Sequence, residues 1–253
     1  MPRIRFLLFF LFLILLGGVF LLLLNANRNY QRPPPPSAVW SPPDKALRVV
    51  SCNIQHGRRG NRAVLEEIGK LNADVVLLQE VEKSDLTVLS EMLGSTPAVY
   101  HASENLAGGH ASWGNAILSR HPLYDAGAIP HPGGGSFGVW ATAVVDNKKF
   151  KIACVHLAAS EAGAAELAGL VQTWREIGSP PVVVGGDFSQ GTAERNYDLM
   201  TQHWVDALKA LGEEGVTGRV DHFLLSKEWK AMEGGVVSLD GSDHKLIWLV
   251  VGK

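Results

Sequence analysis

The stretch Val182 to Ser189 reads Val-Val-Val-Gly-Gly-Asp-Phe-Ser, and it decides how the rest of the chain is interpreted. Three β-branched residues in succession favour a buried strand, and the two glycines after them allow a sharp turn. Asp187 therefore stands directly at the end of a strand. A carboxylate in this position predicts a polar site at the rim of a sheet.

Other polar residues stand at the ends of apolar runs far away in the sequence. Asn53 and Glu80 each follow one such run, and the pair Asp243-His244 precedes another. Carboxylate, amide and imidazole groups at four separated strand ends predict one shared site. A divalent metal and a phosphate are the ligands that suit these groups.

Apolar strands outnumber helices along the chain. The pattern predicts strands over 47–51, 74–79, 115–119, 139–145, 149–156, 182–184, 220–225, 236–239 and 246–251. Helical spacing predicts helices over 61–71, 84–93, 158–177 and part of 197–211. Asp146-Asn147 indicates a hairpin turn. We expect an α/β fold of two packed sheets covered by helices.

The N-terminal segment 1–24 has the character of a transmembrane helix. Its residues 6–24 carry no charge, and nineteen residues of helix span roughly the hydrocarbon core of a bilayer. We expect a retained anchor with the following domain on the extracytoplasmic side. The alternative is a signal peptide cleaved near Ala26, with secretion of the domain, but the apolar regions of signal peptides usually run to only about 7–15 residues.

Residues 25–45 are rich in proline and predict a stiff spacer between the anchor and the domain. The domain, 46–253, carries 18 Lys and Arg against 24 Asp and Glu, a net charge of −6. This balance argues against tight binding to duplex nucleic acid, which relies on a basic surface. It does not exclude cleavage of nucleic acid, because a bound metal supplies local positive charge. We expect a monomer.

Two cysteines, Cys52 and Cys154, lie within apolar strand patterns. Buried structural thiols are the simpler interpretation. A disulfide between them in an oxidising compartment remains open, because spacing alone does not decide it.

The chemistry of the strand-end residues predicts distinct roles. Glu80 and Asp243 offer the oxygen ligands that Mg²⁺ prefers, and Mn²⁺ is the alternative ion. Asp187 is suited to orient or deprotonate an attacking water. His156 and His244 are suited to donate hydrogen bonds to phosphate oxygens as negative charge builds. Asp221 is a reasonable carboxylate partner for His244.

Seven segments, in order, resemble those of the endonuclease/exonuclease/phosphatase superfamily, which includes pancreatic-type DNases, inositol-phosphate phosphatases and neutral sphingomyelinases. They are Ser-Cys-Asn-Ile-Gln (51–55), Leu-Leu-Gln-Glu-Val (77–81), Gly-Asn-Ala-Ile-Leu-Ser-Arg (114–120), Val-His-Leu (155–157), Gly-Gly-Asp-Phe-Ser (185–189), Arg-Val-Asp-His-Phe-Leu-Leu-Ser (219–226) and Ser-Asp-His (242–244). The resemblance covers nearly all of 46–253. It implies a four-layer α/β sandwich with the site at one rim of its two sheets.

The same resemblance implies roles residue by residue. Asn53, Glu80 and Asp243 would form the metal shell, and Asn53 and Asn115 would contact the substrate phosphate. His156 and His244 would flank the phosphate, Asp187 would act on the water, and Asp221 would support His244. Hydrolysis would proceed by in-line attack of water, without a covalent intermediate.

Ser189 departs from the family pattern, which usually has Asn two residues after the aspartate. Loss of a well-placed hydrogen-bond donor costs on the order of 10²–10³ in rate.

From the resemblance as a whole, we expect a metal-dependent phosphodiesterase acting on nucleic acid or a phospholipid-like substrate. A phosphomonoesterase and a catalytically weak module that binds a phosphorylated ligand are the alternatives. Lys245-Leu246 in place of the more usual Arg-Pro is a milder change.

Overall fold

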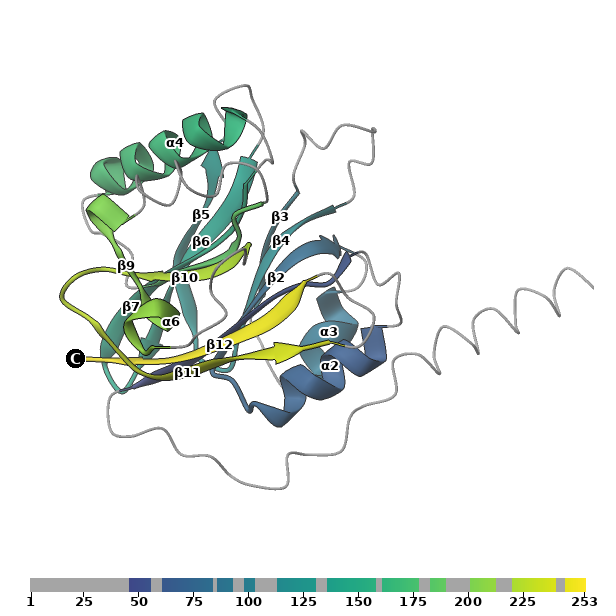
Figure 1. The fold of residues 1–253 in the computed structure, drawn as a ribbon. Helices are drawn as coiled ribbons and strands as arrows, with labels where there is room; N and C mark the ends of the chain where they lie inside the picture. Colours follow the sequence, from purple (N-terminus) through teal and green to yellow (C-terminus); the bar gives the residue numbers. More distant parts are fainter. Residues whose placement is uncertain are drawn as a thin grey trace, which may run out of the picture.

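The computed structural model describes the domain as two stacked sheets with helices on their outer faces (Figure 1). The described residues are 46–55, 61–83, 86–92, 98–102, 113–130, 136–157, 161–177, 183–189, 201–212, 220–239 and 244–253. The expected anchor (1–24) and spacer (25–45) lie outside these ranges. Within them, no helix has the length and apolar character needed to cross a membrane.

The first sheet has six strands in the order β11-β12-β1-β2-β4-β3. These strands are β1 (Leu47–Asn53), β2 (Val75–Glu82), β3 (Ala98–Ala102), β4 (Trp113–Ser119), β11 (Lys230–Ser238) and β12 (Lys245–Gly252). β1 and β2 run parallel, and the chain between them forms helix α2 (Asn61–Lys70). The other neighbouring strands are antiparallel, so the sheet is mixed.

The second sheet repeats this plan in the order β5-β6-β7-β8-β10-β9. Its strands are β5 (Leu123–Pro130), β6 (Ser136–Val145), β7 (Lys148–His156), β8 (Val183–Asp187), β9 (Val205–Asp206) and β10 (Asp221–Leu225). β7 and β8 are its parallel pair, and helix α4 (Glu161–Ile177) lies between them in the sequence. Each sheet therefore has one parallel pair at its centre.

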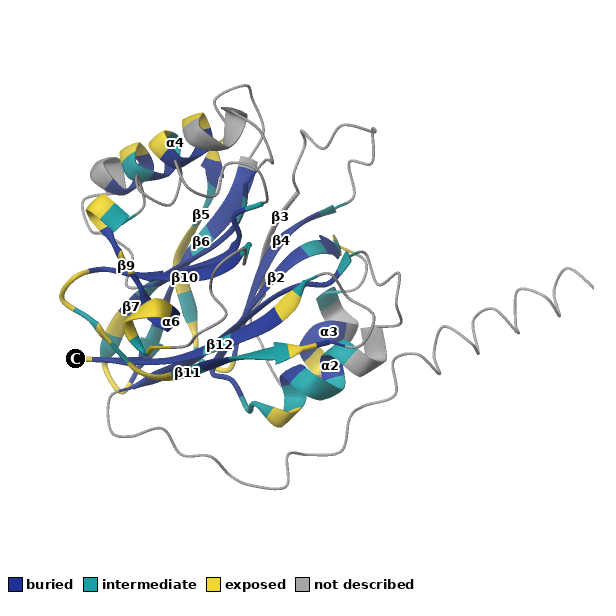
Figure 2. Cartoon of the chain, in the orientation of Figure 1, coloured by how far each residue is buried: buried dark blue, intermediate teal, exposed yellow. Residues whose placement is uncertain are grey.

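The apolar core forms three layers because the central strands are buried on both faces (Figure 2). Between the sheets, Val49 and Leu77 of the first meet Ile152 and Phe223 of the second. The outer faces are covered by helices. The residues that α2, α3 (Leu86–Met92) and α4 contribute to these outer clusters are Leu65, Ile68, Leu89, Leu167, Leu170 and Trp174.

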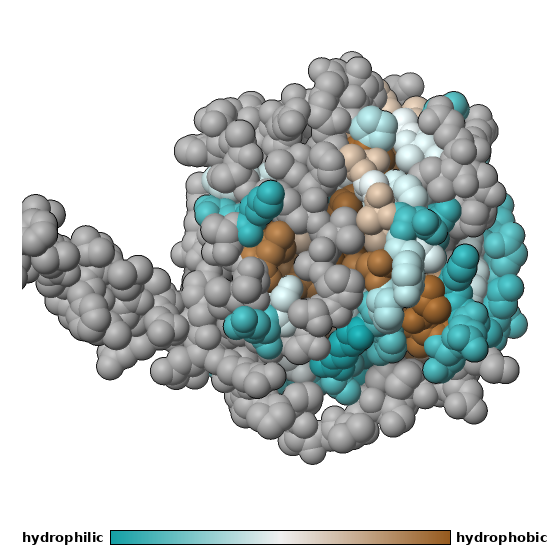
Figure 3. All heavy atoms as spheres, turned by 180° about the vertical axis from the view of Figure 1, so that it is seen from behind, coloured by the Kyte–Doolittle hydropathy of each residue, from teal (hydrophilic) through white to brown (hydrophobic). Residues whose placement is uncertain are grey.

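The surface carries few large apolar side chains. Among the described residues, only Tyr124, Val205 and Met232 are exposed large hydrophobics. Seen from behind, the described surface shows hydrophilic side chains around separate apolar areas (Figure 3). The other large apolar side chains of the described residues are buried or partly buried.

The hairpin expected at Asp146-Asn147 is confirmed. Both residues have positive φ, 47° and 62°, as a two-residue type I′ turn requires. The edge strand β5 was not expected from the sequence. It contains Gly, Asp and Pro, its side chains are largely exposed, and its pairing with β6 shifts register twice, so it lacks the usual strand pattern.

The topology brings six strand ends to one rim. The parallel strands β1 and β2, and likewise β7 and β8, end there with their carboxyl termini. The antiparallel strands β10 and β12 begin there, because Asp221 pairs with Asp187 and Ile247 pairs with Ser51. Residues separated by most of the chain can therefore share one site.

Candidate active site

Asp187 lies at the centre of the contacts at this rim. It ends β8 and is buried, and its two carboxylate oxygens accept hydrogen bonds from different segments. Asn53 Nδ2 donates to Oδ2 at 3.0 Å, and the backbone N–H of Ser189 donates to Oδ1 at 2.8 Å. Asn53 comes from the first sheet, so this contact also joins the two sheets.

Glu80 reaches the rim through a β-bulge. The pairing of β2 with β4 shifts register between Leu78 and Val81, and Glu80 between them has φ of 54°. A left-handed backbone is costly for a residue with a side chain and often marks a functional site. Asn53 Nδ2 also donates to Glu80 Oε1 at 3.0 Å, so one amide bridges carboxylates from both sheets.

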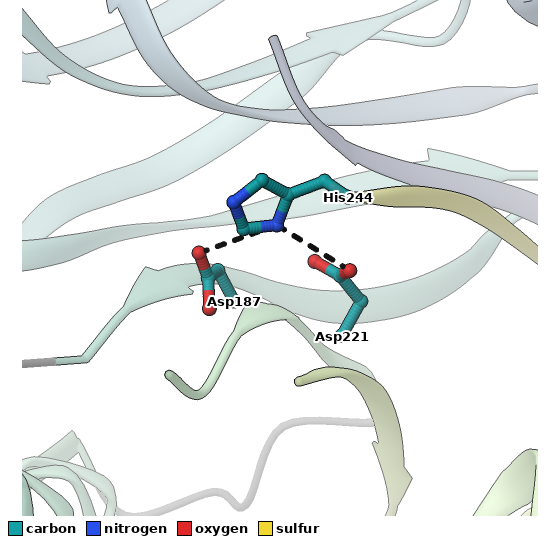
Figure 4. Close-up of side chains that lie close together, drawn as sticks. All are labelled: Asp187, Asp221 and His244. Atoms are coloured by element: carbon teal, nitrogen blue, oxygen red, sulfur yellow. Dashed lines mark ion pairs between the residues drawn. The ribbon is translucent and has the colours of Figure 1, made fainter. Parts of the chain in front are cut away.

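The two predicted histidines lie beside Asp187. His156 Nε2 is 3.5 Å from Asp187 Oδ2, and His244 Nδ1 is 3.6 Å from the same oxygen. Asp221 Oδ2 also lies 3.6 Å from His244 Nδ1, so the imidazole sits between two carboxylates (Figure 4). The expected partnership of Asp221 with His244 is thus present in the geometry.

Asp221 is the most desolvated carboxyl of the group. Burial raises its pKa above the ordinary value, and the charge of Asp187 acts in the same direction, whereas the contact with His244 opposes them. The Lys245 N–H lies 3.5 Å from its Oδ2, and within the described part of the chain its buried Oδ1 has no hydrogen-bond partner. An unsatisfied oxygen of this kind is costly to bury unless a further ligand takes it up.

Three of these side chains have the arrangement of a cation site. One ligand atom from each of Asp187, Asp221 and His244 lies within 4.8 Å of the others. The set expected from the sequence was Asn53, Glu80 and Asp243. Neither Asn53 nor Glu80 belongs to this group of three, although Asn53 Nδ2 donates to both Asp187 and Glu80. Asp243 lies outside the described residues, so the expected set stays a prediction.

The two glycines before Asp187 permit close packing of backbone. Gly186 has φ of +149°, and a Cβ at this position would lie 1.9 Å from the carbonyl oxygen of Val155. A Cβ at Gly185 would lie 2.6 Å from the Phe223 ring in the core between the sheets. The glycines therefore allow β8 to pack closely against β7 and β10, and this packing sets the position of Asp187.

Asn115 and Ser189 occupy different surroundings. Asn115 is buried on β4, and its Nδ2 donates to the carbonyl oxygen of Phe137 at 3.2 Å, which links β4 to β6. Its expected contact with a phosphate stays a prediction. Ser189 is partly exposed beside Asp187 and has φ of 53°, a region that Asn tolerates better than Ser.

Gln79, which pairs with Asn53 directly beneath the rim, was not expected to be part of the site. It is fully buried, and its Nε2 contacts Ser51 Oγ at 3.2 Å and Cys154 Sγ at 3.1 Å. Cys52 and Cys154 are free thiols in the structure, as the simpler interpretation predicted. Burial raises the pKa of Cys154 to about 12 and also raises that of Cys52.

The chain is similar to known proteins in family and fold. A model of the Endonuclease/Exonuclease/phosphatase family matches residues 50–244. The structure of an endonuclease/exonuclease/phosphatase from Bacteroides vulgatus is similar, with a TM-score of 0.67, 15% identity, and coverage of 82% of this chain and 99% of the other. TDP2 from D. rerio, complexed with single strand DNA product, gives a TM-score of 0.64 and 15% identity, covering 83% of this chain and 100% of the other.

An endonuclease/exonuclease/phosphatase from Beutenbergia cavernae has a TM-score of 0.60 and 17% identity, with coverage of 82% and 72%. At these identities the solved structures establish the fold alone. No curated protein matches the chain.

The raised pKa of Asp221 leads to a prediction about stability. As pH rises from the ordinary value of 3.8 towards the folded-state pKa, the unfolded chain releases this proton more readily than the folded chain, so the folded state loses stability. Asp221→Asn removes this effect. In the presence of chelator, its free energy of unfolding relative to wild type should therefore increase as the pH rises above the ordinary value of 3.8.

Denaturant unfolding at several pH values measures this difference. Asp146→Asn, on the exposed hairpin turn, is the matched control for the substitution. A difference between the Asp221→Asn variant and wild type that stays constant across the range would show that burial does not govern this carboxyl.

Proposed function

Because the chain belongs to the endonuclease/exonuclease/phosphatase family, whose members are phosphoesterases, we propose that it hydrolyses a phosphodiester by in-line attack of an activated water. The observation that carries the proposal is the convergence on Asp187. Asn53, His156 and His244, from both sheets, surround its carboxylate at one rim. Such a set combines a proton acceptor with donors for a charged transition state.

The donor set fits a divalent ion of the Mg²⁺ or Mn²⁺ type. The rim gathers carboxylate oxygens, and the buried Oδ1 of Asp221 lacks a hydrogen-bond partner among the described residues. We propose that Asn53, Glu80 and Asp243 hold the ion, with Asp187, Asp221 and His244 next to it. When bound, it would offset the carboxylate charge and make the phosphorus more electrophilic.

The protein's own residues would divide the remaining work. Asp187, held by the N–H groups of Asn53 and Ser189, would orient the water and accept its proton. His156 and His244 would donate to the non-bridging phosphate oxygens. Asp221 would keep the His244 ring in position, since it lies 3.6 Å from Nδ1.

A diester suits this rim better than a monoester. A diester carries one negative charge near the reacting phosphorus, whereas a monoester carries up to two, and repulsion by the carboxylates grows in proportion. In the described part of the chain, the ion-pair partners of Asp187 and Asp221 are histidines. The D. rerio TDP2 structure with single strand DNA product supports a nucleic-acid strand as one candidate, and a phospholipid-like diester is the other. A phosphomonoester remains the second candidate substrate.

The location of the domain is part of the proposal. The uncharged stretch 6–24 is long enough to anchor the chain in a membrane, followed by the proline-rich spacer 25–45. The domain would then act on the extracytoplasmic side, where both nucleic acid and phospholipid are accessible. Release of the domain by cleavage near Ala26 is the alternative.

Turnover should depend on a divalent ion and on His244. With Mg²⁺ or Mn²⁺, we expect hydrolysis of bis-p-nitrophenyl phosphate to exceed that of p-nitrophenyl phosphate. Chelator should abolish it, and His244→Ala should lower kcat by at least about 10²-fold, the typical loss when one transition-state donor is removed. Plasmid DNA and sphingomyelin, assayed in parallel, distinguish the two diester classes.

The control is His121→Ala, at the opposite end of the first sheet from the rim, which should keep its activity. Undiminished turnover in both chelator and the His244→Ala variant would exclude these residues from the mechanism.

Ser189→Asn distinguishes a working enzyme from a binding module. Asn adopts the left-handed backbone of this position more readily and adds an amide donor beside Asp187, so kcat should rise up to about 10²-fold. The variant is assayed on the same diester, together with equilibrium binding of inorganic phosphate. If phosphate binds tightly while kcat stays at the background rate in both wild type and Ser189→Asn, the binding module is the better description.

A further inference from the structure

His222 and Asp206 form a second histidine–aspartate pair. It lies on the opposite face of the second sheet from the Asp221 side chain. His222 follows Asp221 on β10, and successive side chains on a strand point to opposite faces. His222 Nδ1 lies 3.0 Å from Asp206 Oδ2, and both residues are buried, 7% and 4% exposed. The proposed function gives neither His222 nor Asp206 a role.

Asp206 holds the imidazole in a fixed orientation. Its other oxygen, Oδ1, accepts the backbone N–H of Lys209 at 3.2 Å and caps helix α6 (Ala207–Ala210). Its backbone pairs with Leu224 of β10. An ionised carboxylate only accepts hydrogen bonds, so the imidazole donates from Nδ1. This contact therefore fixes the plane of the ring.

The fixed ring supports the residue that follows Asp187. Phe188 is buried on the outer face of the sheet, and its ring meets the His222 ring edge-to-face, with centroids 5.7 Å apart at 82°. Its backbone N–H donates to the carbonyl oxygen of Val220 at 2.8 Å. Phe188 therefore anchors the turn on one side of the sheet while Asp187 faces the rim on the other.

The turn needs this support because it is strained. Ser189 has φ of 53°, and its N–H reaches back to Asp187 Oδ1 at 2.8 Å. Left-handed residues of this kind persist only where the surrounding structure holds them. If Phe188 shifted, the N–H of Ser189 and the carboxylate of Asp187 would move together.

We propose that His222 and Asp206 are positioning residues, which act through Phe188 to hold the Asp187 carboxylate against His156 and His244. This inference rests on the phosphoesterase function proposed above and deepens it. Replacement of a buried charged pair by apolar residues of similar volume is often neutral or stabilising, so orientation is the property that we expect this pair to supply. A displacement of about 1 Å of a reacting group costs on the order of 10² in rate.

The test uses the full-length chain in detergent, with bis-p-nitrophenyl phosphate and Mg²⁺. His222→Phe keeps an aromatic ring for Phe188 but loses the Nδ1 donor. Asp206→Asn keeps the cap of α6, because Asn also accepts from the Lys209 N–H, but presents the wrong group to His222. Both variants should lower kcat by about 10–10²-fold with KM within about twofold, because the carboxylate is misplaced rather than the substrate lost.

A second readout does not need turnover. In protein labelled with ¹⁵N-histidine, the ring resonances of His156 and His244 should shift in both variants. The matched control is His121→Phe, which breaks another histidine–aspartate pair, His121 Nε2 to Asp74 Oδ1 at 3.1 Å, at the far end of the first sheet. It should leave kcat and the ring resonances of His156 and His244 as in wild type.

A double-mutant cycle tests whether the effect passes through Phe188. In the Phe188→Leu background, His222→Phe should reduce kcat no further, because the contact that it acts through is already lost. Independent, multiplicative losses would contradict this route.

Several results would overturn the inference. One is a lowered melting temperature with unchanged kcat and unchanged rim resonances, which is the behaviour of a purely structural pair. Another is a raised KM with unchanged kcat. If His222→Phe does not fold, Asp206→Asn decides by the same criteria. If the wild type hydrolyses none of the substrates, the proposed function fails, and the resonances of His156 and His244 still decide whether the pair positions the rim.

Discussion

Mutual repulsion among buried carboxylates is the constraint on which the site depends. Glu80, Asp187 and Asp221 all lie at one rim, and Asp187 and Asp221 are almost fully buried there. Burial raises the pKa of Asp221, and the like charge of Asp187 adds to this rise. The fold holds them together through Asn53 and two histidines, and apolar packing in three layers offsets the cost.

The internal repetition of the fold explains how these groups converge. Each sheet contributes a parallel pair of strands whose carboxyl ends reach the same rim. The first pair delivers Asn53 and Glu80, and the second delivers His156 and Asp187. Equivalent positions thus carry different chemistry, with an amide and a carboxylate from one half and an imidazole and a carboxylate from the other. In the proposed function, the two halves of the fold would together bind a cation and a phosphate.

Much of this arrangement could be predicted from the sequence because polar residues stand at the ends of apolar runs. Three valines and two glycines precede Asp187, and Leu47, Val49 and Val50 precede Asn53, so the strand and the residue at its end were both visible. The fold class followed from the order of the motifs. Strand β5 was missed because it lies at an edge, where exposure and register shifts erase the periodic signal.

Other features could not be read from the sequence because they depend on contacts between distant segments. Glu80 reaches the rim only through a bulge with positive φ, which no local residue signals. Gln79 stands in the sequence like an ordinary strand residue, yet its buried side chain contacts Cys154 of the other sheet. The pairing of Asp206 with His222 depends on how β9 and α6 pack against β10, and nothing in the sequence connects the two residues.

If the carboxylates at this rim share one divalent cation, crystals of the protein grown with Mn²⁺ should reveal it by anomalous scattering. One strong anomalous peak should lie beside Asn53 and Glu80, next to Asp187 and His244. Crystals at saturating Mn²⁺ with no peak in that space, or with a peak only elsewhere on the molecule, would contradict it.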